Sequence, residues 1–598
     1  MTVPFGATYA AHVDLLTARH RTATVLLAPG RAPLTFGMLH ARIDAMRTQL
    51  AGWNIGPGDV VAWPAVDRVA TAAAIAAVPA CATLMPLPAA LTASAYARVL
   101  ARVKAKAVVA PLGIAHPIVD AARQEGIAEI GLGVGDTGDA AAFGLALVRD
   151  AASLARSATL PPDTLYVALT SGTTGKPKLV PQGWTSIAVT SSALGRTLSM
   201  GPDDVSAHLT TLHLANGLRT ATMLAILNGG AVNVLPEGDL DAFRGAIAAG
   251  EVTYTSSTFT MHRELLRRLE GAPVAERGRL RFLRVASGRL EAEEMDRLET
   301  AFGVPVVTGL STSETGTIAM QRLPPARRTR GSVGSAVASE IRIADEHGAA
   351  LPPGAVGEVQ VRGPQVFDGY LDDPELNATA FVDGWFRLGD LGRFDEHGDL
   401  HLVGRVKDTI NRGGEKIAPQ EIDAVLQALP GVIDAAAFGT PHPSLGEEVV
   451  AAVVRARGSA LDAEQVMAAV RAELGERRAP RTVWFVDALP RTEGGKLRRT
   501  ALAELVQRDA ATPAATRSRA ATPLEMALSA LWTDTLRRAP IGLDENYFML
   551  GGDSLRGAKL LTQVNAAFGV DLPVQALFDA ANTIAGMARS IERARGEP

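Results

Sequence analysis

A dense group of potential phosphate ligands lies between Leu169 and Lys178, where the chain reads Leu-Thr-Ser-Gly-Thr-Thr-Gly-Lys-Pro-Lys. Glycines let a backbone turn tightly, and hydroxyls, amides and lysines donate hydrogen bonds to phosphate oxygens. The spacing Gly-x-x-Gly-Lys lacks the four-residue gap of the nucleotide-triphosphatase loop, so the segment does not match that class. The residues expected to bind phosphate are Thr170, Ser171, Gly172, Thr173, Thr174, Gly175 and Lys176.

A single carboxylate, Glu314, lies in residues 309–316, directly after the apolar stretch 304–308. In α/β proteins a loop at the carboxyl end of a strand faces the ligand crevice. One carboxylate together with substrate phosphates is the usual way in which a protein holds Mg²⁺. Glu314 is therefore a candidate magnesium ligand, and a capped helix start is the alternative for this segment.

Three further residues carry charges that suit a nucleotide: Asp390, Arg405 and Lys496. The aspartate can accept hydrogen bonds from two ribose hydroxyls, and the arginine can reach ribose or phosphate. Two glycines precede Lys496, so a flexible loop can deliver this cation to a phosphate when a domain closes. Taken singly, each residue has a surface turn or a solvated charge as its alternative.

Ser554 opens a predicted helix within the sequence Gly-Gly-Asp-Ser-Leu. A phosphodiester on this serine would lie at the positive end of the helix dipole. A serine at a helix start is otherwise a cap, and Asp553 is an equally good one. Ser554 is thus a candidate attachment site, with an N-cap as the alternative.

Alternating apolar strands and helical stretches fill the first 400 residues, which predicts an α/β fold with mostly parallel strands. The pattern changes to a hairpin near 394–398, and a shorter unit of strand, helix and strand follows it. Farther along, helical spacing predicts helices at 554–568 and 583–593. The expected parts are a large subdomain (1–404), a small mobile subdomain (405–506), a linker with almost nothing to bury (507–521) and a helical domain (522–598).

Composition excludes several classes of protein. Lys and Arg number 59 against 63 Asp and Glu, and the net charge of −4 predicts no nucleic-acid partner. Cys81 is the only cysteine, which rules out an internal disulfide and a thiolate zinc cluster. Residues 1–20 lack the pattern of a signal peptide, and the apolar stretch 69–91 contains three prolines. We therefore predict a buried helix and strand in that stretch, no membrane partner and a cytoplasmic location.

In their order, these motifs resemble the acyl-adenylating superfamily of acyl-CoA synthetases, nonribosomal-peptide adenylation domains and luciferases over residues 25–505. The resemblance implies an α/β acyl-adenylating fold with a large N-terminal and a small α+β C-terminal subdomain, and ATP and Mg²⁺ as cofactors. It assigns phosphate to residues 170–178, magnesium to Glu314, ribose to Asp390, a nucleotide contact to Arg405, adenylation to Lys496 and the interdomain hinge to Lys407. Ser313 stands for the family's threonine, Leu310 for its adenine-stacking tyrosine and Leu179 for a common glycine.

The Gly-Gly-Asp-Ser-Leu segment, with an Asp-Leu-Pro sequence beginning 17 residues after Ser554, closely resembles a phosphopantetheinyl carrier domain. This second resemblance implies an all-α four-helix bundle with 4′-phosphopantetheine on Ser554. It also implies a phosphopantetheinyl transferase as a partner, because that enzyme attaches the group.

The identity of the acid is suggested by residues 208–217. Amino-acid-activating members of the superfamily carry an aspartate there, whereas this stretch has no acid and His213 fills a position usual in acyl-CoA and aryl-acid ligases. The resemblance thus implies a carboxylic acid without an α-amino group, and a buried structural histidine is the alternative. Stretches at 400–405 and 410–417 resemble ligases for small acids such as oxalate. Arg289 is a candidate to neutralise a second carboxylate, with a solvated surface arginine as the alternative.

The combined interpretation is an AMP-forming ligase for natural-product biosynthesis. A small carboxylic acid attacks the α-phosphate of ATP, with His213, Glu314 and Lys496 as the expected catalytic residues. The small subdomain then turns about Lys407, and the acyl group passes to the phosphopantetheine thiol. The linker favours loading within one chain, and a separate downstream enzyme must accept the acyl group. The alternatives are a ligase that releases free acyl-CoA and an α-amino-acid adenylating enzyme with an atypical pocket.

Overall fold

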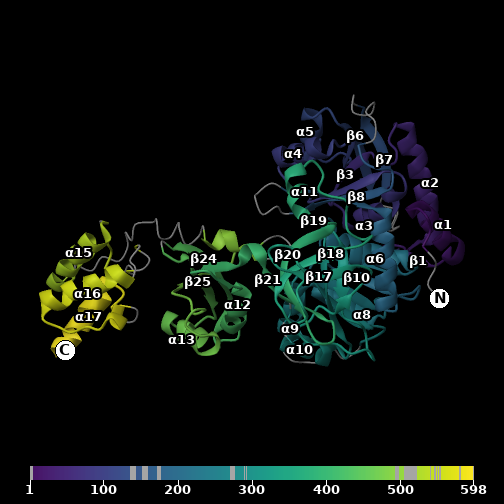
Figure 1. Ribbon diagram of the computed structural model, residues 1–598. Coiled ribbons are helices and arrows are strands. Elements are labelled where there is room, and N and C mark those ends of the chain that lie inside the picture. The colour runs from purple at the N-terminus through teal and green to yellow at the C-terminus, as the bar shows by residue number, and fades with distance from the viewer. Residues whose placement is uncertain are drawn as a thin grey trace. The chain divides into compact units, whose positions relative to one another are not determined.

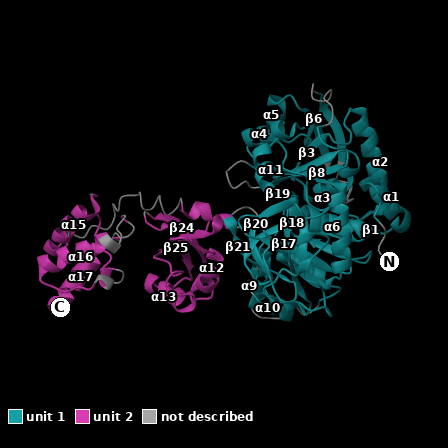
Figure 2. Ribbon diagram, viewed as in Figure 1, with its two compact units in different colours: residues 1–406, 491–496 teal, residues 407–490, 497–598 magenta. Residues whose placement is uncertain are grey.

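The structure of the protein is a computed structural model that describes fifteen stretches of the chain (Figure 1). These are residues 5–134, 143–150, 159–170, 177–269, 277–288, 290, 292–442, 444–491, 497–503, 522–538, 540–543, 547, 550, 554–577 and 581–596. The chain forms two compact units, residues 1–406 with 491–496 and residues 407–490 with 497–598 (Figure 2). The predicted linker 507–521 lies outside the described residues, and the finer boundaries at 404/405 and 521/522 stay predictions.

A seven-stranded sheet in the first unit has the strand order β7-β6-β5-β3-β4-β8-β9, and its five inner strands are parallel. The strands are β3 (Val60–Pro64), β4 (Thr83–Leu87), β5 (Ala107–Pro111), β6 (Ala128–Val134), β7 (Phe143–Arg149), β8 (Thr164–Thr170) and β9 (Lys178–Gly183). Helices α3 (Arg68–Ala77), α4 (Ala93–Val103) and α5 (Pro117–Gln124) lie between them in the chain. Strands β3 and β4 are buried along their whole length, as expected for parallel strands covered on both faces.

The apolar stretch 69–91 lies within this layer. It forms most of α3, a short 3₁₀ helix (η1, Val78–Ala80) and β4, so the predicted buried helix and strand are confirmed. In the described part of the chain, no helix combines the length and the apolar character that crossing a bilayer requires.

A nine-stranded sheet with the order β16-β15-β14-β13-β12-β10-β11-β1-β2 completes the α/β core of this unit. Strands β1, β11, β10, β12, β13 and β14 are parallel, whereas β2, β15 and β16 pair in antiparallel fashion. The strands are β1 (Thr24–Leu27), β2 (Leu34–Thr35), β10 (Val205–His208), β11 (Ala231–Val234), β12 (Tyr254–Thr258), β13 (Phe282–Ala286), β14 (Val306–Thr312), β15 (Gly316–Met320) and β16 (Ser335–Ala336). The helices are α1 (Tyr9–His20), α2 (Phe36–Gly52), α6 (Trp184–Thr197), η3 (a π-helix, Asn216–Met223), α7 (Leu224–Leu227), α8 (Leu240–Ala248), α9 (Phe259–Leu269) and α10 (Ala292–Phe302).

The predicted alternation of strands and helices ends earlier than expected, at β14 rather than near residue 394. An antiparallel sheet follows, with the order β17-β18-β20-β19 and with β21 paired to β20. Its elements are β17 (Glu340–Ala344), β18 (Gly357–Arg362), α11 (Pro374–Ala380), β19 (Phe381–Val382), β20 (Trp385–Phe394) and β21 (Leu400–Arg405).

A repeated turn sequence explains this departure. Asp-Glu-His-Gly occurs at 345–348 and at 395–398, and the Asp Oδ1 accepts two backbone N–H groups in both turns. Gly348 and Gly398 have φ values of +85° and +78°, which favour glycine. Both copies therefore reverse the chain, although only the second was predicted to form a hairpin.

The second unit begins with a five-stranded sheet, in which β23-β22-β25-β24 are neighbours and β26 pairs with β25. Its elements are η4 (a 3₁₀ helix, Val406–Asp408), β22 (Ile410–Arg412), β23 (Glu415–Ile417), α12 (Pro419–Gln427), β24 (Val432–His442), β25 (Gly446–Arg455), α13 (Ala463–Leu474) and β26 (Thr482–Phe485). Buried Ile, Leu, Val and Ala side chains of the strands pack with those of α12 and α13 to form its core.

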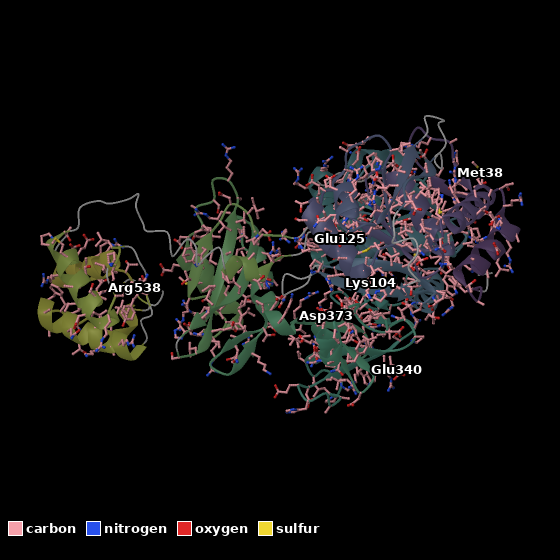
Figure 3. All side chains as sticks on the ribbon, turned by 90° about the horizontal axis from the view of Figure 1, so that it is seen from above. Met38, Lys104, Glu125, Glu340, Asp373 and Arg538 are labelled. Atoms are coloured by element: carbon pink, nitrogen blue, oxygen red, sulfur yellow. The ribbon has the colours of Figure 1, made fainter. Side chains whose placement is uncertain are left out.

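The C-terminal helices of this unit are α15 (Pro523–Leu536), α16 (Ser554–Phe568), η5 (a 3₁₀ helix, Val574–Leu577) and α17 (Ile584–Arg595). Thr522 and Glu525 form a reciprocal capping box at the start of α15. Trp532 of α15 is fully buried and meets the ring of Tyr547 edge to face, and its indole Nε1 donates to the Met587 sulfur of α17. Charged side chains lie at the surface of both units, with Lys104, Glu340 and Arg538 as exposed examples (Figure 3).

Candidate functional site

Strands β8 and β9 bracket the predicted phosphate segment. They pair in antiparallel register, with half-buried Thr170 opposite Lys178. Leu179, which replaces a common glycine of the family, is fully buried in the apolar core beside this hairpin. Residues 171–176 lie outside the described residues, so phosphate binding by Ser171, Gly172, Thr173, Thr174, Gly175 and Lys176 stays a prediction.

Glu314 lies in a tight turn between β14 and β15, and neighbouring elements hold the backbone of that turn. Gln182 Nε2 of β9 donates to the Ser313 carbonyl at 2.9 Å, and the Phe367 N–H donates to the Glu314 carbonyl at 2.9 Å. Gly316 has φ of +66°, and a Cβ there would lie 2.4 Å from Arg219 Nη2. Glycine is therefore required at this position, and the turn that presents Glu314 is fixed by its surroundings.

The Glu314 carboxylate has a specific partner that sequence reasoning missed. Tyr370 donates its hydroxyl hydrogen to Glu314 Oε1 at 2.8 Å, and Lys178 Nζ lies 3.4 Å from the Tyr370 oxygen and 4.6 Å from the ring centroid. Burial, and then the charge of Glu314, raises the pKa of Tyr370, so its hydroxyl remains a proton donor. The end of the predicted phosphate segment and the predicted magnesium ligand are thus joined through one tyrosine.

The donor set suits a magnesium ion held jointly with phosphates. Glu314 Oε2 has no hydrogen-bond partner among the described residues. Among the described residues, no group of three or more His, Cys, Asp or Glu side chains is placed so that it could bind a metal ion through protein ligands alone. Mg²⁺ is usually bound through one or two carboxylates plus substrate phosphates and water, and Glu314 fits that pattern.

Asp390 and Arg405, predicted from separate motifs, lie opposite each other on β20 and β21. The Arg405 Nε atom is 3.0 Å from Asp390 Oδ1. Asp390 is buried at 7% exposure, whereas Arg405 is exposed. A carboxylate held in this way offers fixed acceptor oxygens, which is the chemistry needed to bind ribose hydroxyls.

The predicted hinge and carrier residues lie on the second unit, and the predicted adenylation lysine lies outside the described residues. Lys407 is exposed in η4, where the chain passes from the first unit to the second. Lys496 lies outside the described residues. Ser554 is the first residue of α16, so its backbone is at the helix N-terminus where an attached phosphodiester is favoured.

The predicted substrate stretch 208–217 connects β10 to η3. His208 Nε2 lies 3.0 Å from the Gly217 carbonyl, and burial lowers the pKa of His208 to about 3, so the ring is neutral and donates this bond. A Cβ on Gly217 would lie 2.2 Å from the Thr211 carbonyl, which explains the glycine. His213 lies in this stretch and is buried at 5% exposure, which is compatible with both its catalytic and its structural interpretation.

Two other residues singled out in the sequence are Leu310 and Arg289. Leu310 is buried at 8% exposure among Ile318, Val359 and Leu400, so the position of the family's stacking tyrosine contributes to the apolar core. Arg289 lies outside the described residues.

Comparison with protein families gives three matches in order along the chain. The model "AMP-binding enzyme" matches residues 15–371, which is more than half of the chain. "AMP-binding enzyme C-terminal domain" matches residues 421–496, and "Phosphopantetheine attachment site" matches residues 527–591.

Individual proteins match most of the chain as well. It is 34% identical over 487 residues to Probable CoA ligase CCL9 of Humulus lupulus (80% of this chain, 93% of the relative). It is 34% identical over 489 residues to Oxalate–CoA ligase of Arabidopsis thaliana (80% and 95%). The solved structure of ATP-bound MatB from Rhodopseudomonas palustris superposes with a TM-score of 0.75 at 28% identity, covering 83% of this chain and 99% of that one.

Proposed function

Because this chain belongs to the AMP-binding enzyme family and carries a phosphopantetheine attachment domain, we propose that it loads a small carboxylic acid onto its own carrier. The predicted acyl-adenylating fold, the C-terminal carrier domain and the AMP-forming ligase activity are confirmed by the family matches. The proposal adds two points. The acyl acceptor is phosphopantetheine attached to Ser554, and the chain serves in natural-product assembly. The single observation that carries it is the fusion of all three family domains in one chain.

In the first half-reaction the acid attacks the α-phosphate of ATP and pyrophosphate leaves. Glu314, held by Tyr370, would hold Mg²⁺ against the phosphates, and this ion would supply charge neutralisation. Asp390 would hold the ribose hydroxyls, with Arg405 fixing its carboxylate. Lys496 would bring a second positive charge to the transferred phosphoryl group, and His213 would lie beside the acid.

In the second half-reaction the acyl group moves to the carrier. The passage between the two units at Lys407 supports its role as the hinge about which Lys496 withdraws. Phosphopantetheine on Ser554 supplies the thiol that accepts the acyl group as AMP leaves. The sequence predicts a linker of about 15 residues, and a chain of that length would span roughly 20 Å (root mean square) if it behaved as a random coil, which would give the carrier a high effective concentration near the adenylating domains of the same chain.

Intact mass measurement tests the acyl acceptor. Treatment with coenzyme A and a phosphopantetheinyl transferase should add about 340 Da to the chain, the formula mass of the group. ATP and the acid should then add an acyl increment. Ser554→Ala should lose both increments and keep substrate-dependent pyrophosphate exchange, since the adenylation site lies in other domains and a lost cap costs only about 1 kcal/mol. An unmodified wild-type chain would contradict the proposal.

The same wild-type and Ser554→Ala proteins also test the two alternative functions, release of free acyl-CoA and adenylation of an α-amino acid. The curated relatives named above are CoA ligases, which favours release of free acyl-CoA as the second candidate. Free acyl-CoA formed as fast by Ser554→Ala as by the wild type would support that candidate. A screen of carboxylic and α-amino acids by pyrophosphate exchange identifies the substrate, and oxalate belongs in it because one relative acts on oxalate.

The proposal includes two protein partners and a cellular location. A phosphopantetheinyl transferase would modify Ser554, and a separate downstream enzyme would take the acyl group from the carrier. A cytoplasmic location is also part of the proposal, and the composition, which is that of an ordinary globular protein, supports it.

A further inference from the structure

An ion pair holds the chain on each side of Lys407. Before it, Arg405 is the last residue of β21, pairs in register with Asp390 of β20 and lies 3.0 Å from its carboxylate. After it, Asp408 Oδ2 lies 3.7 Å from Arg499 Nε. The Arg499 and Asp408 side chains are 10% and 17% exposed, so water screens their attraction only in part. The first pair belongs to the first unit and the second pair to the second unit.

Arg499 joins Asp408 to the body of the small subdomain. Its Nη2 atom bonds to the Asp423 carboxylate of α12, and its Nη1 atom donates to the Ala437 carbonyl of β24 at 3.2 Å. Asp423 Oδ1 in turn accepts from the Ala437 N–H at 2.6 Å. Both elements contribute buried side chains to the core of this subdomain. The residue that follows Lys407 is therefore tied through one arginine to a helix and a strand of that core.

Only Val406 and Lys407 lie between these two anchors. Both are exposed, Val406 at 41%, and none of the residues of η4, all of which are described, is buried. Farther along, Ile410 of β22 is 1% exposed and is fixed by packing in the core. The torsion angles of residues 406–407 can therefore change with little loss of packing, whereas a turn at Asp408 would break an ion pair. Without that pair, the second anchor would move from Asp408 to Ile410.

We propose that Asp408 and Arg499 are positioning residues that confine the turn of the small subdomain to residues 406–407. The inference rests on the proposed function, in which that turn withdraws Lys496 and lets the carrier thiol reach the acyl adenylate. A hinge that is short and anchored on both sides gives the small subdomain few alternative orientations, so less conformational entropy is lost each time it reaches a reactive one. The hinge then has a defined length, which a single substitution can restrict completely.

The test asks whether loss of the second anchor rescues a restricted hinge. In Lys407→Pro the ring fixes φ of residue 407, and its bulk also restricts Val406, the residue before it. Every residue between the anchors is then restricted, so carrier loading should slow about tenfold or more relative to pyrophosphate exchange. Adding Asp408→Ala moves the second anchor to Ile410. Because the two changes act on one hinge, the double variant should regain most of the lost loading rate.

The measured quantity is the ratio of carrier loading to pyrophosphate exchange in the full-length protein with phosphopantetheine attached. Loading is followed as the acyl increment in intact mass. A purely structural pair would lower both rates, so the double variant would load no faster than Lys407→Pro. Asp408→Asn keeps the shape of the side chain and removes its charge, so it should rescue loading as Asp408→Ala does. Arg499 stays unchanged, because its removal would leave the buried Asp423 carboxylate without its cation.

Glu421→Ala is the matched control. Glu421 lies on α12, two residues before Asp423, and its carboxylate is 3.3 Å from Arg478 Nε. The variant therefore removes an ion pair of similar length from the same subdomain without touching either anchor of the hinge. Combined with Lys407→Pro, it should leave carrier loading as slow as in Lys407→Pro alone.

Amide hydrogen exchange gives a second measurement, which needs no activity. After correction for intrinsic rates, the amides of residues 408–409 should exchange several-fold faster in Asp408→Ala than in the wild type, and at the wild-type rate in Glu421→Ala. Unchanged amide exchange in Asp408→Ala, normal loading by Lys407→Pro, or no rescue in the double variant would overturn the anchor and leave the proposed function in place. A wild type that never loads Ser554 would overturn the proposed function, and the amide exchange would still decide the anchor.

Discussion

Removal of a single hydroxyl group tests how Glu314 is held. In Tyr370→Phe the ring keeps its edge-to-face contact with Phe367, whose centroid is 4.8 Å away, and Lys178 keeps its position over the ring. The variant loses the 2.8 Å hydrogen bond to Glu314 Oε1 and the longer, 3.4 Å hydrogen bond that the Tyr370 oxygen accepts from Lys178 Nζ. It therefore changes the positioning of the predicted magnesium ligand with little change in packing.

The expected magnitude follows from the bond to Glu314, which is the shorter of the two and the one that positions the predicted magnesium ligand. A hydrogen bond to a charged group contributes about 1.5–3 kcal/mol, and removing an outer partner of a metal-binding side chain commonly lowers metal affinity 10- to 100-fold. Glu314 is only half-buried, so water replaces part of the lost interaction and the lower end applies. We expect the Mg²⁺ concentration for half-maximal activity to rise about tenfold, equivalent to about 1.4 kcal/mol.

The assay is substrate-dependent pyrophosphate exchange titrated with Mg²⁺ at saturating ATP and acid. Tyr9→Phe is the control, because Tyr9 is buried in the same unit and its hydroxyl donates to the Ala76 carbonyl at the same distance, 2.8 Å. That variant should lose about 1 kcal/mol of stability and keep the wild-type Mg²⁺ dependence. An unchanged Mg²⁺ requirement in Tyr370→Phe, or an equal rise in Tyr9→Phe, would refute the reasoning.

Three further variants separate the steps of the reaction. Lys496→Ala should lower pyrophosphate exchange about a hundredfold or more and spare thioester formation from supplied acyl adenylate, because the lysine acts on the phosphates; normal exchange would refute its role. Lys407→Pro should spare exchange and slow carrier loading, since proline restricts the hinge, and equal effects on both half-reactions would remove the hinge argument. His213→Asp should lower exchange with the native acid by placing a negative charge beside its carboxylate, and discovery of an α-amino acid as native substrate would contradict this.

Regular spacing made parts of the fold predictable. The helix predicted at 554–568 has those bounds in α16, because its apolar positions recur at a helical period and define both ends. Of the antiparallel sheet from β17 to β21 only the hairpin near 394–398 could be predicted, because the other pairings are set by register between strands distant in the chain, which no local period reports. The repeated Asp-Glu-His-Gly turn at 345–348 was the signal available in the sequence.

The candidate site likewise contains residues that the sequence could predict and residues that it could not. Glu314, Asp390 and Arg405 could be predicted as candidates from residue type and motif, and their roles stay predictions, whereas the pairing of Asp390 with Arg405 is visible only in the structure. Tyr370 could not, because its role comes from contact with Glu314, which is 56 residues away in the chain. An isolated tyrosine in a sequence predicts core packing, and only its hydrogen-bond partner in the folded chain shows otherwise.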